Sequence, residues 1–158
     1  GVYKRQHQQG INQRATPADA EPVGALVDAL LMELAGIPSR RDARVQAAAR
    51  LLALPDRVFG VLAVDDDGQE IGVIMLTESA SIYAGGAFGV ITELYVAPAH
   101  RSSGLAQRLL TEADNIGRAR AWPLLEVGAP RQPQWARSLS FYLRHGFTEI
   151  GPRLKRPL

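Results

Sequence analysis

The spacing of apolar residues changes along this chain of 158 residues, and these changes limit the folds that it can adopt. Between residues 19 and 55 apolar residues recur every three or four positions, which predicts two helices separated by Gly36 and Pro38. Residues 58–97 hold three apolar runs divided by turns, as consecutive strands do. Helix-like and strand-like segments alternate after Arg101. The sequence therefore predicts one mixed α/β domain in which hairpin-linked strands precede crossover units.

The expected order of elements is strand, helix, helix, three strands, helix, strand, helix, strand. Strands are expected at 11–14, 58–64, 71–76, 87–97, 124–127 and 147–150, and helices are expected to begin near Asp19, Ser39, Ser103 and Pro133. Ser39 and Asp42 resemble a capping box, in which two side chains satisfy free N–H groups at a helix start. Gly146 is expected to end the last helix in the left-handed conformation. Residues 1–9 are expected to form a polar tail before a domain that spans 10–158.

Composition and charge exclude several classes of function. The chain has no cysteine, so it has no disulfide, no thiolate metal site and no cysteine nucleophile. Its net charge is +2 and its arginines are scattered, whereas a nucleic-acid-binding surface needs a dense basic stripe. No apolar run approaches the roughly 20 residues that span a bilayer, and the start lacks a secretory pattern. We therefore expect a cytoplasmic protein that has no nucleic-acid or membrane partner and no metal.

The stretch from Glu93 to Ala106 carries the clearest chemical signal. A strand ends there before a turn of small residues, and an amphipathic helix begins near Ser103. The first N–H groups of a helix have no partner inside it, and the helix dipole places positive charge beside them, so this site suits phosphate. Gly104 would let a diphosphate approach the backbone, and Arg101 adds a positive charge. The glycine spacing fits neither a P-loop nor a dinucleotide-binding fingerprint.

Several segments resemble the GNAT superfamily of acyl-CoA-dependent N-acetyltransferases. Residues 101–106 read Arg-Ser-Ser-Gly-Leu-Ala and are similar to the family motif Arg/Gln-x-x-Gly-x-Gly/Ala, and Leu94–Pro98 resembles the strand ending before it. Residues 140–147 are similar to the family's Phe/Leu-Tyr-x-x-x-Gly-Phe, and residues 14–19 resemble its first strand and turn. The resemblance covers about residues 10–151 and implies a single GNAT-like domain with a twisted, mixed central sheet flanked by helices.

The resemblance implies a binding site for acetyl-CoA as the co-substrate. The backbone groups of Tyr95 and Val96 would pair with the pantetheine where their strand splays from its neighbour. The pyrophosphate would be held by the N–H groups of Arg101, Ser102, Ser103, Gly104, Leu105 and Ala106. The sequence departs from the family pattern at Trp135, because family members often carry there an asparagine that contacts the cofactor.

The resemblance also implies roles for two side chains. Tyr142 would protonate the leaving CoA thiolate, and Glu93 would take a proton from the acceptor amine, for which a raised pKa would suit it. The alternatives are that Tyr142 is a packed aromatic ring and that Glu93 is a polar residue on a partly exposed strand face. Glu78 is a second candidate for the base.

The function that the resemblance implies is transfer of an acetyl group from acetyl-CoA to a primary amine of a small molecule or peptide. We expect direct attack in a ternary complex, because no cysteine is present to hold the acetyl group. One alternative is a non-catalytic acyl-CoA-binding module that acts as a sensor or scaffold, although Tyr142 and Glu93 favour the enzyme. A weaker one is an arginine-rich nucleic-acid binder. A homodimer fits the resemblance, and no residue pattern identifies the acceptor.

Overall fold

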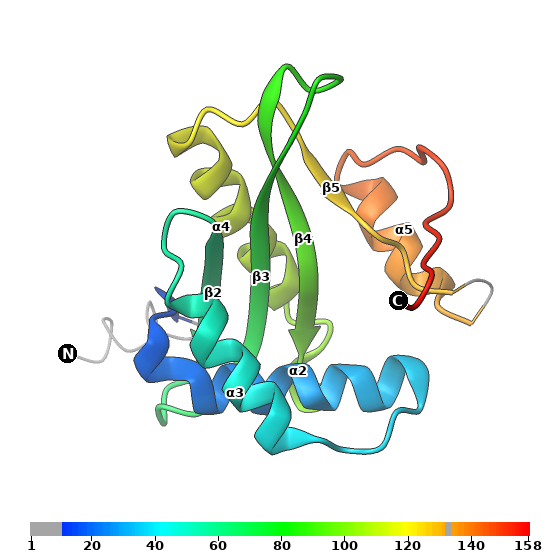
Figure 1. Cartoon of the computed structure of the whole chain (residues 1–158). Coiled ribbons are helices and arrows are strands. Elements are labelled where there is room, and N and C mark those ends of the chain that lie inside the picture. Colours follow the sequence, from blue (N-terminus) through cyan, green and yellow to red (C-terminus); the bar gives the residue numbers. More distant parts are fainter. Residues whose placement is uncertain (1–10, 132–133) are drawn as a thin grey trace.

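The computed structural model describes residues 11–131 and 134–158 (Figure 1). Along the chain the elements are β1 (Ile11–Arg14), the 3-10 helix η1 (Pro17–Asp19), α2 (Ala20–Ala35), α3 (Arg41–Leu52), β2 (Val58–Val64), β3 (Glu70–Ser81), β4 (Gly86–Val96), the 3-10 helix η2 (Pro98–His100), α4 (Leu105–Ala119), β5 (Leu125–Val127) and α5 (Ala136–Arg144). The expected tail over residues 1–9 and the expected helix start at Pro133 lie outside the described residues.

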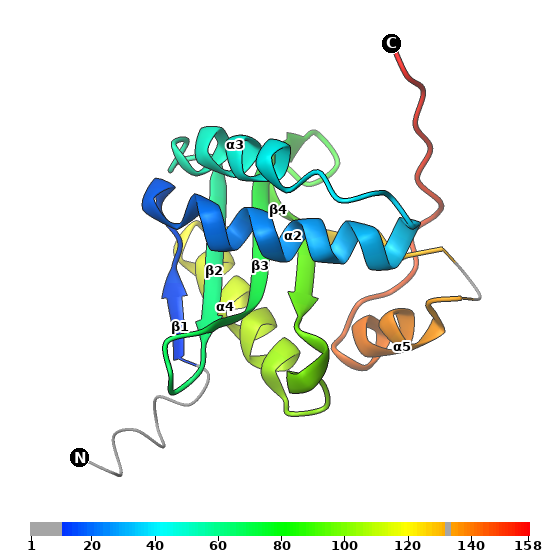
Figure 2. The ribbon, with the colours of Figure 1, turned by 90° about the horizontal axis from the view of Figure 1, so that it is seen from below.

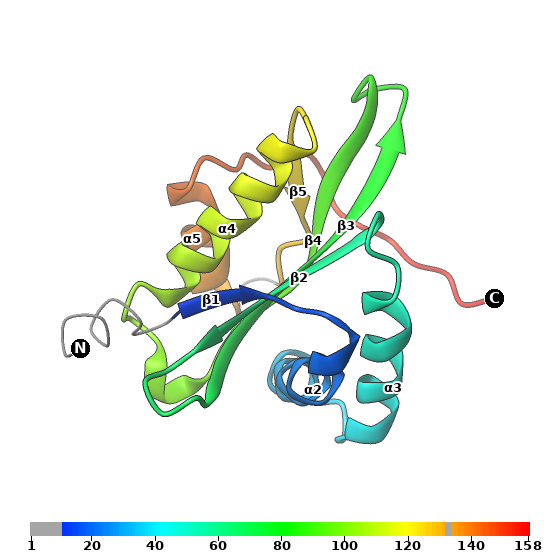
Figure 3. The same ribbon diagram turned by 90° about the vertical axis from the view of Figure 1, so that its left-hand side faces the viewer.

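The strands of the described chain form one mixed sheet in the order β1-β2-β3-β4-β5. Neighbouring strands are antiparallel except β4 and β5, which are parallel and are therefore joined by a crossover through α4. Figure 3 shows that α2 and α3 cover one face of the sheet and α4 the other, and in Figure 2 α2 runs across the strands. The expected mixed α/β domain is confirmed.

The continuous apolar run of β2 supplies two cores because successive residues of a strand face opposite sides of the sheet. Leu62 packs with Val73 of β3 against α2 and α3. Its neighbour Val61 packs with Ile74 against α4 on the other face. At most 1% of each of these four side chains is exposed. A sheet buried on both faces needs apolar residues at every position, and this explains the dense apolar run of the sequence.

The strand expected over Phe147–Ile150 is not formed, and this prediction was wrong. The N–H of Phe147 donates instead to the carbonyl oxygen of Tyr142 (3.1 Å), so it belongs to the turn that ends α5. That turn passes through Gly146, whose φ of 91° is the expected left-handed conformation. The next residues are exposed, Ile150 to 72%, and therefore offer no apolar face that would hold them beside β5.

The third strand is longer than its apolar pattern predicts. We expected residues 71–76, whereas β3 continues to Ser81. The extra residues pair with the start of β4, from Thr77 opposite Val90 to Ser81 opposite Gly86. Backbone pairing rather than burial holds this part of the hairpin, which projects beyond the helices (Figure 1).

The connection between α2 and α3 is held by Asp28 rather than by the expected capping box. The hydroxyl of Ser39 donates to Asp28 Oδ2 (2.6 Å) and the N–H of Arg40 donates to Oδ1 (2.8 Å). α3 accordingly begins at Arg41 without a side-chain cap. Asp28 is buried on α2 and needs these donors, and it thereby fixes the loop that follows the end of α2.

Candidate active site

β4 and β5 pair over three residues and then separate. The parallel ladder ends with Ile91 opposite Val127. On the other side of β4 the register against β3 shifts, because Met75 is opposite Glu93 while Leu76 is opposite Ile91. The intervening Thr92 is therefore a bulge, which bends a strand and redirects its side chains. Figure 1 shows the two strands diverging below this point.

A cleft of about 80 Å³ lies at this divergence. Its lining includes Leu30 and Leu34 from α2, Glu93 from the bulged part of β4, and Ser138 and Tyr142 from α5. The fold thus brings the two proposed catalytic side chains to one cavity from separate elements.

Glu93 is a half-buried carboxyl group on β4. The hydroxyl of Thr92 donates to its Oε1 (2.5 Å). Burial raises the pKa of Glu93 above its ordinary value, and the hydrogen bond from Thr92 offsets part of that rise. A carboxylate with a raised pKa accepts a proton more readily at neutral pH.

Tyr142 lies on α5 among other aromatic rings. Its ring makes edge contacts with those of Phe141 and Phe147, each with 5.5 Å between ring centroids. Burial raises the pKa of the Tyr142 phenol to about 12. The phenol is therefore protonated throughout the neutral range and can donate its proton inside the cleft.

The start of α4 presents a row of free backbone N–H groups. Among the described residues no acceptor faces the N–H groups of Ser102, Ser103, Gly104, Leu105, Ala106 and Gln107. Ser102 and Gly104 have positive φ angles, 66° and 83°. A Cβ built on Gly104 would meet only Arg108 Nη1, at 3.5 Å. The space over these N–H groups is therefore open, and turns of this kind bind anions.

The guanidinium of Arg101 does not face this row of N–H groups. Its Nε donates to the carbonyl oxygen of Val96 (2.9 Å) and its Nη2 forms an ion pair with Glu33 (2.9 Å). It also lies over the ring of Tyr95, 5.4 Å from the centroid. Arg101 thus joins the end of β4 to α2 instead of supplying free charge beside the phosphate site.

Arg108 is the cation beside the N–H groups, and the sequence analysis missed it. Its Nη1 lies 3.4 Å from the carbonyl oxygen of Ser103. Arg108 follows Gly104 by four residues, and residues four apart share one face of a helix. This spacing is the signal that could have found it.

Glu78, the second candidate for the base, is engaged elsewhere. Arg120 Nε (2.7 Å) and Trp122 Nε1 (2.6 Å) both donate to its Oε1. The hydrogen bond from Arg120, followed by that from Trp122, lowers the pKa of Glu78. Glu78 does not line the cleft, so its carboxylate is a structural partner of Arg120.

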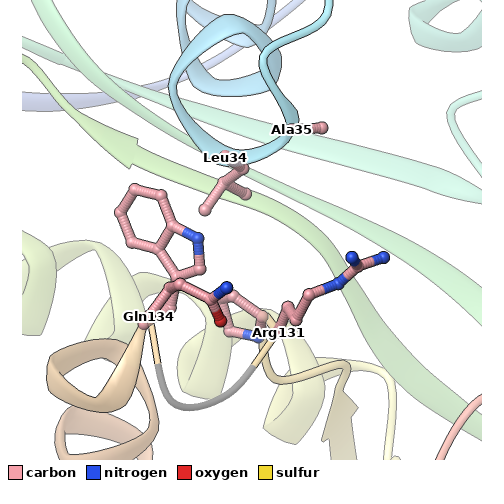
Figure 4. Close-up of a pocket in the computed structure, with 6 residues that line it drawn as sticks. Leu34, Ala35, Arg131 and Gln134 are labelled. Carbon is pink, nitrogen blue, oxygen red and sulfur yellow. The ribbon is translucent and has the colours of Figure 1, made fainter.

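A larger cavity of about 450 Å³ adjoins the cleft. The two cavities share Leu34 and Pro130 in their linings. Figure 4 shows Leu34 and Ala35 at the end of α2 opposite the loop that bears Arg131 and Gln134. Trp135, at the start of α5, also lines this cavity.

Two other kinds of site were sought in the described part of the chain. It holds no group of three or more His, Asp or Glu residues that could bind a metal ion. None of its helices has the length and apolar character needed to cross a membrane.

Three comparisons place this site among known proteins. A family model described as an acetyltransferase (GNAT) domain matches residues 57–149, more than half of the chain. No curated protein sequence matches the chain. Among solved structures, an integron cassette protein from the mobile metagenome of Cole Harbour Salt Marsh is 24% identical, with a TM-score of 0.77, over 100% of this chain and 92% of that one.

Two further structures are similar to the chain. A ribosomal-protein-alanine N-acetyltransferase from Brucella melitensis biovar Abortus 2308 is 19% identical, with a TM-score of 0.71, over 93% of this chain and 98% of that one. An aminoglycoside acetyltransferase from an uncultured soil metagenomic sample is 20% identical, with a TM-score of 0.75, over 93% and 97%. These structural likenesses concern the fold, whereas the family model spans the cleft, the start of α4 and Tyr142. The chain therefore belongs to the GNAT superfamily of acetyltransferases.

Proposed function

We propose that the protein is an N-acetyltransferase that moves an acetyl group from acetyl-CoA to a primary amine. The observation that carries the proposal is the shared cleft of Glu93 and Tyr142 at the end of the β4–β5 ladder. A carboxyl group whose pKa burial raises and a phenol that stays protonated supply a base and an acid at neutral pH.

Acetyl-CoA would bind along the end of β4 and the start of α4. The free N–H groups from Ser102 to Ala106 suit its diphosphate, because they are adjacent and open to solvent above Gly104. The N–H of Arg101 already donates to Pro98 (3.3 Å), so we propose that this residue shapes the turn. The backbone groups of Tyr95 and Val96, beyond the parallel ladder, would pair with the pantetheine.

In the proposed reaction the amine nitrogen attacks the carbonyl carbon of the thioester, so that a C–N bond forms and the C–S bond breaks. Glu93 takes the proton that the nitrogen loses and passes it to solvent. Tyr142 gives its proton to the departing thiolate and recovers one from solvent. The two proton transfers leave an amide, free CoA thiol and an unchanged protein.

Direct transfer in a ternary complex is part of the proposal, because the chain contains no cysteine to carry the acetyl group. Initial-rate lines measured at several acceptor concentrations should therefore intersect. Parallel lines, or an acetylated protein isolated without acceptor, would contradict direct transfer.

The rival function is an acyl-CoA-binding module that does not turn the ligand over. Such a module would use the start of α4 but would have no need of a base and an acid in one cleft. Glu93 and Tyr142 therefore favour the enzyme. The two similar acetyltransferases are named for different acceptors, a ribosomal protein and aminoglycosides, so the shared fold leaves the acceptor open. A homodimer and a cytoplasmic location remain predictions of the sequence.

The experiment is an acceptor screen with the purified full chain, acetyl-CoA and detection of free CoA thiol. The panel should include an alanyl peptide, an aminoglycoside, polyamines and small monoamines. We expect amine-dependent release of CoA that falls in Glu93→Gln but not in the control Glu149→Gln, whose side chain is exposed. Acetyl-CoA binding without release in the presence of any amine would support the sensor instead.

A further inference from the structure

We propose that the acceptor is a small monoamine carried on a compact apolar body, and that this body binds in the cavity of about 450 Å³ between α2 and the start of α5. The inference rests on the proposed acetyl transfer and narrows its substrate class. It excludes polyamines and aminoglycosides as preferred acceptors.

The first argument is the chemistry of the cavity wall. Leu34 and Ala35 come from the end of α2, and Pro130 and Trp135 face them from the segment before α5. Figure 4 shows Leu34 directed toward the loop that carries Gln134. A cavity of this volume holds a small organic molecule, and apolar walls favour an apolar one because burying apolar surface is the main driving force.

The second argument is the count of charges. Arg131 is the only charged residue that lines the larger cavity, and Glu93 is the only one that lines the cleft, within the described chain. An acceptor with several ammonium groups would have to place one of them against apolar walls near Arg131. This would cost desolvation and repulsion without a carboxylate to compensate. One carboxylate suits one amine.

The third argument is the connection between the cavities. Leu34 and Pro130 line both, so the larger cavity opens toward Glu93 and Tyr142. An amine with an apolar body in the larger cavity can therefore extend its nitrogen toward Glu93. The linker between the body and the nitrogen must be short, because the two cavities are adjacent.

The test compares 2-phenylethylamine, ethylamine, spermidine, kanamycin and a peptide with an apolar N-terminal residue, each with acetyl-CoA and the full chain. Burial of the phenyl ring should give 2-phenylethylamine a kcat/KM at least about tenfold above that of ethylamine. It should exceed those of spermidine and kanamycin by at least as much. A preference for spermidine, kanamycin or the peptide would overturn the inference while leaving acetyl transfer intact.

A charge added to the wall provides a second test. Ala35→Glu places a carboxylate in the cavity, and it should raise the ratio of kcat/KM for spermidine over 2-phenylethylamine about tenfold. Met32→Glu is the control, because Met32 is exposed on the same helix and lines neither cavity. An equal change of the ratio in both variants would mean that the larger cavity does not hold the acceptor.

The failure of acetyl transfer is distinguishable from the failure of this inference. If no amine releases CoA, the proposed function is wrong. Calorimetric titration of the same amines into the CoA-saturated protein then decides the occupant of the cavity. Tighter binding of 2-phenylethylamine than of spermidine, lost in Ala35→Glu and kept in Met32→Glu, supports the inference, and the reverse order overturns it.

Discussion

Glu93 on β4 and Tyr142 on α5 line one cleft, and burial raises the pKa of both side chains. The two shifts have opposite chemical consequences. The carboxyl group becomes a stronger base, whereas the phenol becomes a weaker acid that keeps its proton. The bulge at Thr92 produces this pairing, since it turns the end of β4 toward α5 where β5 no longer covers it.

The pH dependence of the reaction should report Glu93. Because burial raises its pKa, kcat for the preferred amine should rise with pH through a value above the ordinary 4.5 of a glutamate. Glu93→Gln should lower kcat on the order of a hundredfold and remove this limb of the profile. If the variant keeps the limb, another group accepts the proton.

The two glutamates of the sheet should affect stability in opposite directions. The pKa of Glu93 is raised, so the folded state binds more protons than the unfolded state between the two pKa values, and stability falls as pH rises through that window. Ionised Glu93 therefore costs stability at neutral pH, and Glu93→Gln should raise Tm there.

Glu78 is the matched opposite case, because its pKa is lowered by Arg120 and Trp122. Its contribution is present above the unfolded pKa and is lost as pH falls through the folded pKa. Glu78→Gln should lower the free energy of unfolding by about 1–2 kcal/mol at neutral pH. Thermal melts at neutral and acidic pH check both signs, and equal shifts in the two variants would contradict the assignments.

The turn before α4 should control acetyl-CoA affinity. Gly104→Glu places charge and bulk over the free N–H groups, and we expect at least a tenfold weaker Kd by calorimetry. Gly68→Glu is a close control for backbone strain, because its φ of 81° matches the 83° of Gly104 and nothing lies within 4 Å of its Cβ position. Equal loss of affinity in both variants would locate the diphosphate elsewhere.

Two arginines near this turn should separate by function. Arg108→Ala should weaken acetyl-CoA binding about tenfold and reduce its dependence on salt, because Arg108 lies beside the open N–H groups. Arg101→Ala should mainly lower stability, by about 1 kcal/mol, because it removes bonds to Val96 and Glu33. A larger loss of affinity in Arg101→Ala than in Arg108→Ala would reverse these roles.

The sequence predicted elements where burial and period agree. The dense run Val58–Val64 and the amphipathic segment of α4 were placed within about two residues, because one face or both faces of each are buried. It failed where pairing or a turn decides the structure. Thr77–Ser81 is held by its ladder with β4, and Phe147 is drawn into the turn after Tyr142.

The site was predicted to a similar degree. Motif resemblance identified the start of α4, Glu93 and Tyr142 as candidates, but the bulge at Thr92 depends on the register between two strands, which no local pattern encodes. The role of Arg101 was missed for the same reason, because its partner Glu33 lies far away in the sequence, on α2.

The central claim is that Glu93 and Tyr142 perform the proton transfers of acetyl transfer in one cleft, and single-turnover rates measure this step apart from product release. With saturating amine, we expect Tyr142→Phe to slow the transfer tenfold to a hundredfold, because only a hydroxyl is lost and a thiolate is already a fair leaving group. Glu93→Gln should slow it about a hundredfold, the exposed control Tyr83→Phe should not slow it, and all three variants should bind acetyl-CoA as tightly as the unaltered chain. Unaltered single-turnover rates in both Tyr142→Phe and Glu93→Gln would contradict the account.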